Sequence, residues 1–303
     1  MKTIFHLNKS LAVLLLLTMF AFNAFCAQLT VRVQGKGAPV LMLPGLGCPN
    51  TVFDELSATL SRDYTLHRVE IPGFAENPPM RERSEDDHIV NLAKVVRAYV
   101  RENQLKRPAL IGHSFGGFFA TYLATQYPEE FGPVISIDGV PFFSALFYPA
   151  ATEKSSAPYA KQMAQSQLAA TADQFLAQQQ ATLISMMKDK KRAKALAALT
   201  AGSDRQTLAT IVSTMMQTDL RSDLSKLQRP LLLIAAPGGF PPGEARKQAI
   251  LAYRAQLYAS KLASLAVAEN SRHFVQFDEP AWLSETVRRF LAEFPAASSN
   301  AAP

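Results

Sequence analysis

The sequence predicts an α/β fold built on a mostly parallel sheet, and three observations lead to this prediction. Continuous apolar runs, typical of strands that are buried on both faces, recur at 38–43, 133–137 and 230–236. Segments with apolar residues at helical spacing separate most of these runs. From 142 to 227 the chain becomes rich in Ala, Gln, Met, Lys and Ser, with helical periodicity and no strand-like run. This last segment is predicted to be a helical cap inserted between two strands.

The individual elements follow from local patterns. The first strand alternates polar and apolar residues, which is typical of a sheet edge, whereas the strand at 38–43 is a continuous apolar run, as expected of a strand buried on both faces. Acidic residues at Asp86 and Asp87, after Ser84, mark the start of a helix, because the helix dipole favours negative charge there. The expected strands are 28–33, 38–43, 64–71, one ending at 107–110, 133–137, 230–236 and 262–268. The expected helices outside the cap are 51–60, 84–103, 118–127, 244–260 and 280–294.

The composition is that of a globular chain. Of the 303 residues, 48% are hydrophobic and 18% are charged, so the chain can bury a substantial core. The formal net charge of +6 is small for this length, and the basic residues are scattered except for a run at 188–194. We interpret this run as a solvated helix face, because no nucleic-acid-binding motif accompanies it. We therefore expect no nucleic-acid partner.

The first residues are organised like a secretory signal peptide. Lys2 and Lys9 supply positive charge, and residues 11–22 form an apolar stretch. Ala24 and Cys26 are small residues at the two positions that a signal peptidase reads. The apolar stretch is too short for a comfortable transmembrane span, so no stable membrane span is expected.

We therefore expect residues 1–26 to be removed by cleavage after Cys26, and the protein to be exported, to the periplasm or to the medium. The alternative is a lipoprotein anchored through Cys26, but Phe25 is a poor fit to the small residue usual before a lipidated cysteine. After cleavage Cys48 is the single remaining thiol, so no internal disulfide is expected.

The motif that organises the chain is Gly112-His113-Ser114-Phe115-Gly116-Gly117, which follows an apolar run and opens a helical pattern. Ser114 therefore lies at a strand-to-helix junction in a Gly-x-Ser-x-Gly frame. Glycine fits the flanking positions because a very tight turn leaves no space for side chains there. The amides at the start of the helix point at the serine and can hold a developing negative charge. We interpret Ser114 as a nucleophile; the alternative is an incidental serine in a glycine-rich turn.

This motif resembles the nucleophile elbow of the α/β-hydrolase superfamily. The resemblance covers nearly the whole chain after the first few tens of residues, apart from the variable middle region. It implies an α/β-hydrolase core formed by 27–141 and 228–296, with the helical cap at 142–227. It also implies catalysis without a metal or an organic cofactor.

The resemblance also indicates an oxyanion hole and a base. Pro44-Gly45-Leu46-Gly47 resembles the family's oxyanion loop, with Pro44 where a histidine is more common. We assign the two oxyanion donors to the backbone N–H groups of Leu46 and Phe115. A serine needs a base, and His273 lies between the last strand and the last helix, where the family places its histidine. His113 is adjacent to Ser114, but on an elbow its side chain points elsewhere, so it is left out.

The acid departs from the commonest family pattern, which places it within a few residues after the strand at 230–236. Residues 237–240 contain no acid. Glu244 is the nearest, but it starts a helix, where the dipole alone explains a glutamate. Asp138 ends the preceding core strand, a position that some α/β-hydrolases use for their acid, although others carry an acid there without using it. We favour Asp138, keep Glu244 as the alternative acid, and leave open another residue, such as Asp219, or a missing acid.

These residues predict an exported serine hydrolase that cleaves a carboxylic-ester-like bond through an acyl-enzyme on a Ser-His-Asp triad. The alternatives are cleavage of an amide, lactone, peptide or diketone on the same triad, and a non-catalytic binding protein. A dehalogenase or epoxide hydrolase is disfavoured, because it would need an acid in place of Ser114. The expected partner is a small ester-like substrate; its identity and the oligomeric state are not determined by the sequence.

Overall fold

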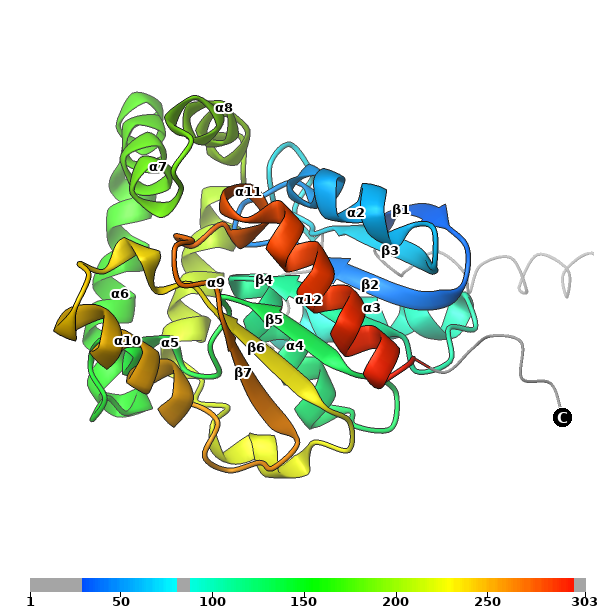
Figure 1. The fold of residues 1–303 in the computed structure, drawn as a ribbon. Coiled ribbons are helices and arrows are strands. Elements are labelled where there is room, and N and C mark those ends of the chain that lie inside the picture. The colour runs from blue at the N-terminus through cyan, green and yellow to red at the C-terminus, as the bar shows by residue number, and fades with distance from the viewer. Residues whose placement is uncertain (1–28, 81–87, 297–303) are drawn as a thin grey trace, which may run out of the picture.

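One sheet of seven strands organises residues 29–80 and 88–296, which the computed structural model describes (Figure 1). The strands lie in the order β1-β3-β2-β4-β5-β6-β7. Their bounds are Thr30–Gly35 for β1, Ala38–Leu43 for β2, Tyr64–Glu70 for β3, Ala109–His113 for β4, Val134–Ile137 for β5, Leu231–Ala235 for β6 and Ala263–Val267 for β7. All neighbours pair in parallel except the edge pair β1 and β3. The prediction of a mostly parallel α/β sheet is confirmed.

Some expectations fall on residues outside this description. The signal peptide predicted for 1–26, with its cleavage site at Cys26, lies outside the described residues, as does the helix start predicted at Ser84. Within 29–80 and 88–296, no helix combines the length and the apolar character needed to cross a membrane.

The burial of the strands explains why they could be predicted from the sequence. Every residue of β4 and β6 is buried, because helices cover both faces of the sheet and leave no position for a polar side chain in water. Strand β1, at the edge, has only exposed and half-buried residues. Its polar character and antiparallel pairing are typical of an edge strand.

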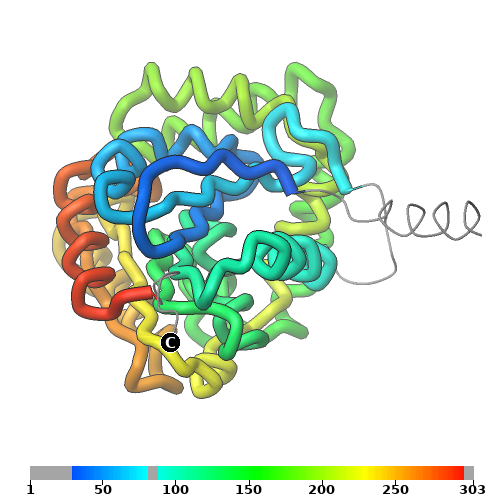
Figure 2. Tube along the Cα trace, turned by 90° about the vertical axis from the view of Figure 1, so that its right-hand side faces the viewer, coloured from blue at the N-terminus to red at the C-terminus, as the bar shows by residue number. Residues whose placement is uncertain are grey.

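Two apolar clusters lie on opposite faces of the sheet. One includes buried residues of α3 and α4, and the other includes buried residues of α2 and α12. In Figure 2 the closing helix α12, in red, lies along one side of the molecule. The bounds of the core helices are η2 Asn50–Phe53, α2 Asp54–Leu60, α3 His88–Glu102, α4 Phe115–Gln126, α10 Glu244–Ala255, α11 Val275–Asp278 and α12 Pro280–Glu293.

Between β5 and β6 the chain forms helices only, which lie to one side of the sheet in Figure 1. We call them the inserted helices; their bounds are α5 Phe143–Phe147, α6 Glu153–Ala169, α7 Ala172–Met186, α8 Lys190–Ala201 and α9 Arg205–Gln217, followed by η3 Ser222–Lys226. The four longer helices each begin at a side-chain cap: Thr152, Thr171, Asp189 and Asp204 accept hydrogen bonds from backbone N–H groups of the first turn. Such caps stabilise helices that lack strong amphipathic patterns.

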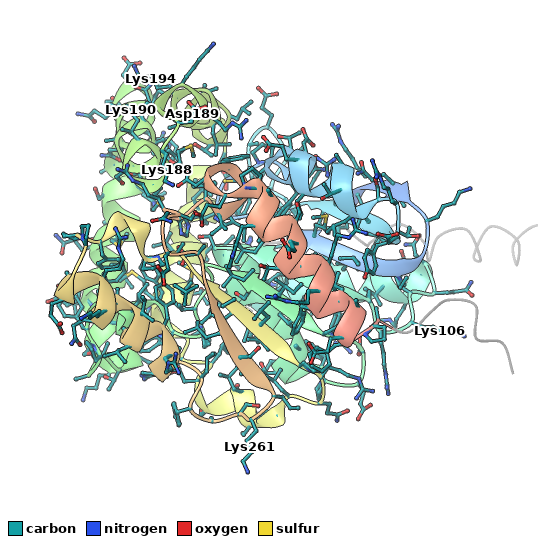
Figure 3. All side chains as sticks on the ribbon, viewed as in Figure 1. Lys106, Lys188, Asp189, Lys190, Lys194 and Lys261 are labelled. Carbon is teal, nitrogen blue, oxygen red and sulfur yellow. The ribbon has the colours of Figure 1, made fainter. Side chains whose placement is uncertain are left out.

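The basic run at 188–194 covers the end of the turn between α7 and α8 and the start of α8. Figure 3 shows Lys188, Lys190 and Lys194 at the outer end of this turn. These three lysines are exposed, and Arg192 forms an ion pair with Glu55 of α2 at 2.8 Å. The geometry is that of a solvated helix face, as expected from the sequence.

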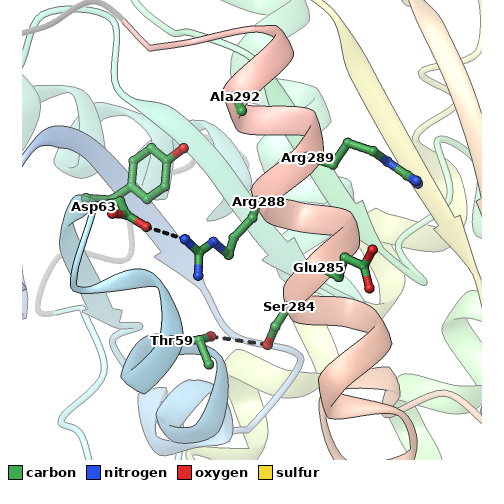
Figure 4. Close-up of a pocket in the computed structure, with 8 residues that line it drawn as sticks. Thr59, Asp63, Ser284, Glu285, Arg288, Arg289 and Ala292 are labelled. Carbon is green, nitrogen blue, oxygen red and sulfur yellow. Dashed lines mark hydrogen bonds and ion pairs between the residues drawn. The ribbon is translucent and has the colours of Figure 1, made fainter.

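A groove of about 650 Å³ runs between α2 and α12 (Figure 4). Arg288 bonds to Asp63 at 2.9 Å across it, and Thr59 donates to Ser284 at 3.2 Å. The residues that line it include none of the predicted catalytic residues. Those residues follow the carboxyl ends of the strands instead.

Candidate active site

Ser114 occupies a strained turn between β4 and α4. Its φ is 54° and its ψ is −119°, a backbone conformation that residues with a side chain rarely adopt. Three backbone hydrogen bonds hold it: Ser114 N–H donates to Ile137 at 2.8 Å, and its carbonyl accepts from Gly117 at 2.9 Å and Phe118 at 3.0 Å. The turn therefore fixes the direction of the serine side chain at the end of β4.

The flanking glycines are required by close backbone contacts. A Cβ atom on Gly112 would lie 2.0 Å from the carbonyl oxygen of Gly116, and a Cβ on Gly116 would lie 2.0 Å from that of Leu43. Any side chain at either position would force the strand and the helix apart. The steric explanation of the Gly-x-Ser-x-Gly frame is therefore visible in the structure.

The structure brings His273 and Asp138 together although they are 135 positions apart in the chain. The Nδ1 atom of His273 lies 2.5 Å from Oδ2 of Asp138. A carboxylate oxygen can only accept, so Nδ1 carries the proton and Nε2 of a neutral His273 is left as the basic nitrogen. This is the tautomer that a general base next to a serine needs.

Strand order explains why Ser114, Asp138 and His273 share one edge of the sheet. They follow β4, β5 and β7, which are all parallel. The residues just before Ser114 and Asp138, His113 and Ile137, are direct partners across the β4–β5 pair. Parallel strands end at the same edge, so the three residues follow the edge at which such sheets place functional groups.

The carboxylate of Asp138 is buried and fully hydrogen-bonded. Its side chain is only 7% exposed. While Oδ2 faces His273, Oδ1 accepts from the hydroxyl of Tyr253 at 2.6 Å and from the backbone N–H of Ala236 at 3.1 Å. A buried charge is costly without such partners, and three donors offset that cost.

The other candidate acids have different partners. Glu244 is the first residue of α10, and its carboxylate accepts from Gln248 of the same helix at 2.6 Å. Asp219 forms an ion pair with Arg221 at 2.6 Å. Among the acids considered from the sequence, Asp138 is the one that hydrogen-bonds to His273.

The loop predicted to form the oxyanion hole lies against the serine. A Cβ on Gly45 would be 3.3 Å from the Cβ of Ser114. Leu46, the next residue, packs against a cluster of Val212, Met216 and Ala160 from the inserted helices. Phe115 is the first residue of α4, so its N–H has no acceptor within the helix and is available to a ligand.

His113 lies closer to His273 than the sequence indicated. Its ring is fully buried, and its centroid is 4.7 Å from that of His273. Its Nε2 bonds to the backbone carbonyl of His273 at 3.0 Å, so this nitrogen carries the proton. Burial, reinforced by the charge of His273, lowers the pKa of His113 well below its usual range. His113 is therefore a neutral structural partner of the His273 backbone.

Tyr253 is a site residue that sequence reasoning missed. It lies in α10 with 2% of its surface exposed, and burial together with the Asp138 charge raises its pKa well above the usual value. The signal available in the sequence was weak: a tyrosine on the inward face of a helix needs a partner for its hydroxyl. Its partner lies 115 positions earlier, and no local pattern points to it.

The segment carrying His273 is bonded to the turn between α7 and α8. Phe274 N–H donates to the carbonyl of Met186 at 3.3 Å. Asp278 accepts from the backbone N–H of Lys188 at 2.9 Å and from that of Arg272 at 2.8 Å. The inserted helices are thus joined to the His273 segment by one backbone–backbone bond and by the carboxylate of Asp278.

The parallel sheet, the strained serine and the His273–Asp138 contact together define the class of protein: an α/β enzyme with a nucleophile elbow. The chain belongs to the alpha/beta hydrolase family, which matches residues 40–286.

Curated relatives support an enzyme of this class. A pimeloyl-[acyl-carrier protein] methyl ester esterase of Shewanella woodyi is 28% identical over 214 residues, covering 69% of this chain and 78% of that protein. The protein of the same name from Shewanella sp. (strain MR-7) is 30% identical over 211 residues, covering 68% and 75%. The family and these esterase relatives identify the chain as a hydrolase.

Solved structures show the same fold. MenH from S. aureus superposes with a TM-score of 0.70 at 12% identity, covering 88% of this chain and 98% of that one. An esterase from Exiguobacterium antarcticum superposes with a TM-score of 0.70 at 17% identity, covering 87% and 95%. At these identities the likeness concerns the fold alone.

Proposed function

We propose that the chain is an exported serine hydrolase that cleaves a small carboxylic ester through an acyl-enzyme, with Ser114, His273 and Asp138 as its triad. The observation that carries this proposal is the 2.5 Å contact between His273 Nδ1 and Asp138 Oδ2 at the sheet edge where Ser114 stands on its strained turn. The names of the curated relatives support an ester as the substrate.

In the first half of the reaction, Ser114 Oγ attacks the ester carbonyl carbon while Nε2 of His273 takes the hydroxyl proton. Asp138 stabilises the resulting imidazolium and keeps its ring oriented. The tetrahedral intermediate then expels the alcohol, whose oxygen receives the proton from His273. In the second half His273 takes a proton from a water molecule, which attacks the acyl carbon. The bond between this carbon and Ser114 Oγ then breaks, the acid leaves, and His273 returns the proton to Oγ.

The backbone N–H groups of Leu46 and Phe115 are assigned as the donors that stabilise the negative charge on the carbonyl oxygen of the tetrahedral intermediate. The N-terminus of α4 contributes its partial positive charge at the same place. The apolar contacts of Leu46 with Val212 and Met216 support an apolar substrate group next to this loop.

Export is part of the proposal and is supported by the pattern of Lys2, Lys9, the apolar stretch 11–22 and Cys26. Sequencing the N-terminus of the protein recovered from outside the cytoplasm tests it. A mature chain beginning at Ala27 is expected. A protein that keeps Met1 and stays in the cytoplasm contradicts export, and a lipid-modified Cys26 supports the lipoprotein alternative.

The enzymatic part is tested with a short-chain aryl ester and a fluorophosphonate probe. We expect turnover by the wild type, covalent labelling that maps to Ser114, and loss of both in Ser114→Ala. The control Ser225→Ala removes an exposed serine from η3 and retains both. Turnover that survives Ser114→Ala, or no turnover and no labelling of the wild type, overturns the proposal. A panel of amide and lactone substrates separates the alternatives that share the triad.

A further inference from the structure

We propose that Tyr253 is a positioning residue of this triad: its hydroxyl holds the carboxylate of Asp138 in the orientation that presents Oδ2 to His273. This inference rests on the proposed function, and neither the family match nor the relatives assign a role to Tyr253.

The carboxylate of Asp138 uses its two oxygens for different tasks. Oδ2 accepts from His273 at 2.5 Å. Oδ1 accepts from Tyr253 at 2.6 Å and from the backbone N–H of Ala236 at 3.1 Å. One oxygen therefore acts on the base, and the other is held by donors from two separate elements, the end of β6 and the C-terminal part of α10.

The support from Tyr253 is the shorter of the two hydrogen bonds that Oδ1 accepts. The terminal torsion of an aspartate is broad, so the orientation of its carboxylate depends on its donors. Without Tyr253, Oδ1 would keep only the backbone N–H of Ala236 at 3.1 Å. A second donor on the same oxygen fixes the plane of the carboxylate, and with it the direction of Oδ2.

Helix α10 is well placed to supply the second donor, because it is bonded to the chain just after Asp138. The side chain of Gln256 accepts from the backbone N–H of Phe142 and donates to its carbonyl, both at 3.0 Å. Tyr253 and Gln256 are three positions apart and therefore share one side of the turn that ends α10. Two side chains of this turn thus tie α10 to the segment 138–142.

The hydroxyl stays a donor over the whole working range of pH. Tyr253 is buried, and burial together with the Asp138 charge raises its pKa well above the usual value, so the phenol stays protonated near neutral pH. The loop before α10, where the family more commonly carries its acid, has none at 237–240. In this chain the region that follows β6 supplies a donor to an acid placed one strand earlier.

The test is a double-mutant cycle on the purified protein, with aryl-ester hydrolysis as the assay. Tyr253→Phe keeps the ring and removes the hydroxyl; we expect kcat to fall about tenfold with KM unchanged. In an Asp138→Asn background the same change is expected to lower the residual kcat less than about twofold, because the side chain that Tyr253 then holds no longer accepts the Nδ1 proton of His273. Equal losses in both backgrounds, or a kcat of Tyr253→Phe equal to that of the wild type, overturn the inference.

The matched control is Tyr99→Phe, which removes another tyrosine hydroxyl that bonds to a side chain, Nδ1 of His67, at 2.8 Å. It is expected to retain kcat and KM. Thermal unfolding of each variant verifies that the fold is kept.

A second readout does not depend on turnover and so separates this inference from the proposed function. The Nδ1 proton of His273 is expected to give a low-field NMR resonance that shifts and broadens in Tyr253→Phe but not in Tyr99→Phe. An unchanged resonance overturns the role of Tyr253, whether or not the protein hydrolyses esters. If Ser114-dependent turnover is absent but the resonance responds to Tyr253→Phe, the proposed function is rejected and the role of Tyr253 is kept.

Discussion

Replacing Asp138 by Asn exchanges one carboxylate oxygen of the candidate triad for an NH₂ group and reverses one hydrogen bond. The amide oxygen of the new side chain is expected to stay with Tyr253 and Ala236, because both are donors. Its NH₂ group then faces Nδ1 of His273, where the carboxylate had accepted. A donor at this position stabilises the tautomer with the proton on Nε2, and this tautomer cannot take the proton of Ser114.

The expected loss follows from this tautomer change. In serine proteases the corresponding substitution lowers kcat by about 10⁴. Here we expect kcat to fall by about 10³ to 10⁴, which corresponds to about 4 to 5.5 kcal/mol of transition-state stabilisation. KM is expected to change little, because Asp138 is buried behind His273 and its side chain is only 7% exposed.

The assay is steady-state hydrolysis of an aryl ester near neutral pH, with thermal unfolding measured in parallel. Glu244→Gln is the matched control, because it makes the same change of carboxylate to amide on an acid whose bond is to Gln248. It is expected to retain full activity. A loss below about tenfold in Asp138→Asn refutes the reasoning, because the wrong tautomer alone costs more. A large loss in Glu244→Gln moves the acid to the later position.

Two further predictions concern buried groups around the site. The pKa of His113 is lowered by burial, so the unfolded chain takes up a proton below about pH 6.5 that the folded protein resists. The contribution of the neutral His113 to the unfolding free energy is therefore present above that pH and is lost as the pH falls. In His113→Gln, the unfolding free energy should decline less steeply below pH 6.5, by up to about 1.4 kcal/mol per pH unit. An unchanged slope contradicts the assignment. Burial raises the pKa of the Cys48 thiol to about 12, so native protein at about pH 8 is expected to resist iodoacetamide and to react only after denaturation. Rapid alkylation of the native protein, detected by mass spectrometry, would contradict this burial.

The sheet could be predicted from the sequence because of its burial. Strand β6, for example, is apolar at every position, and both of its faces are covered. Helix ends were less predictable. The helix expected over 244–260 ends at Ala255, where the backbone N–H groups of Gln256 and Leu257 bond to carbonyls three positions earlier, at Tyr253 and Arg254. Such a tightened last turn has no distinct sequence pattern, so the apolar spacing extended the prediction beyond it.

Some residues of the candidate site could also be predicted from the sequence, and others could not. Ser114 and His273 have local signals, in the glycine frame and in the position between the last strand and helix. The choice between Asp138 and Glu244 depends on which carboxylate meets His273 in space, and a sequence of one chain does not fix that distance. Tyr253 and the contact of His113 with His273 arise entirely from packing between segments far apart in the chain.

The bonds between the α7–α8 turn and the His273 segment have a consequence for how this enzyme can change. Met186 and Lys188 belong to the segment inserted between β5 and β6, yet their backbone groups bond to Phe274 and Asp278 of the core. A rigid-body swing of α7 and α8 away from the sheet would pull on the loop that carries the base. In the proposed enzyme, replacement of these two helices would therefore remove hydrogen bonds that hold the loop around His273, and with them part of the support of the proposed base.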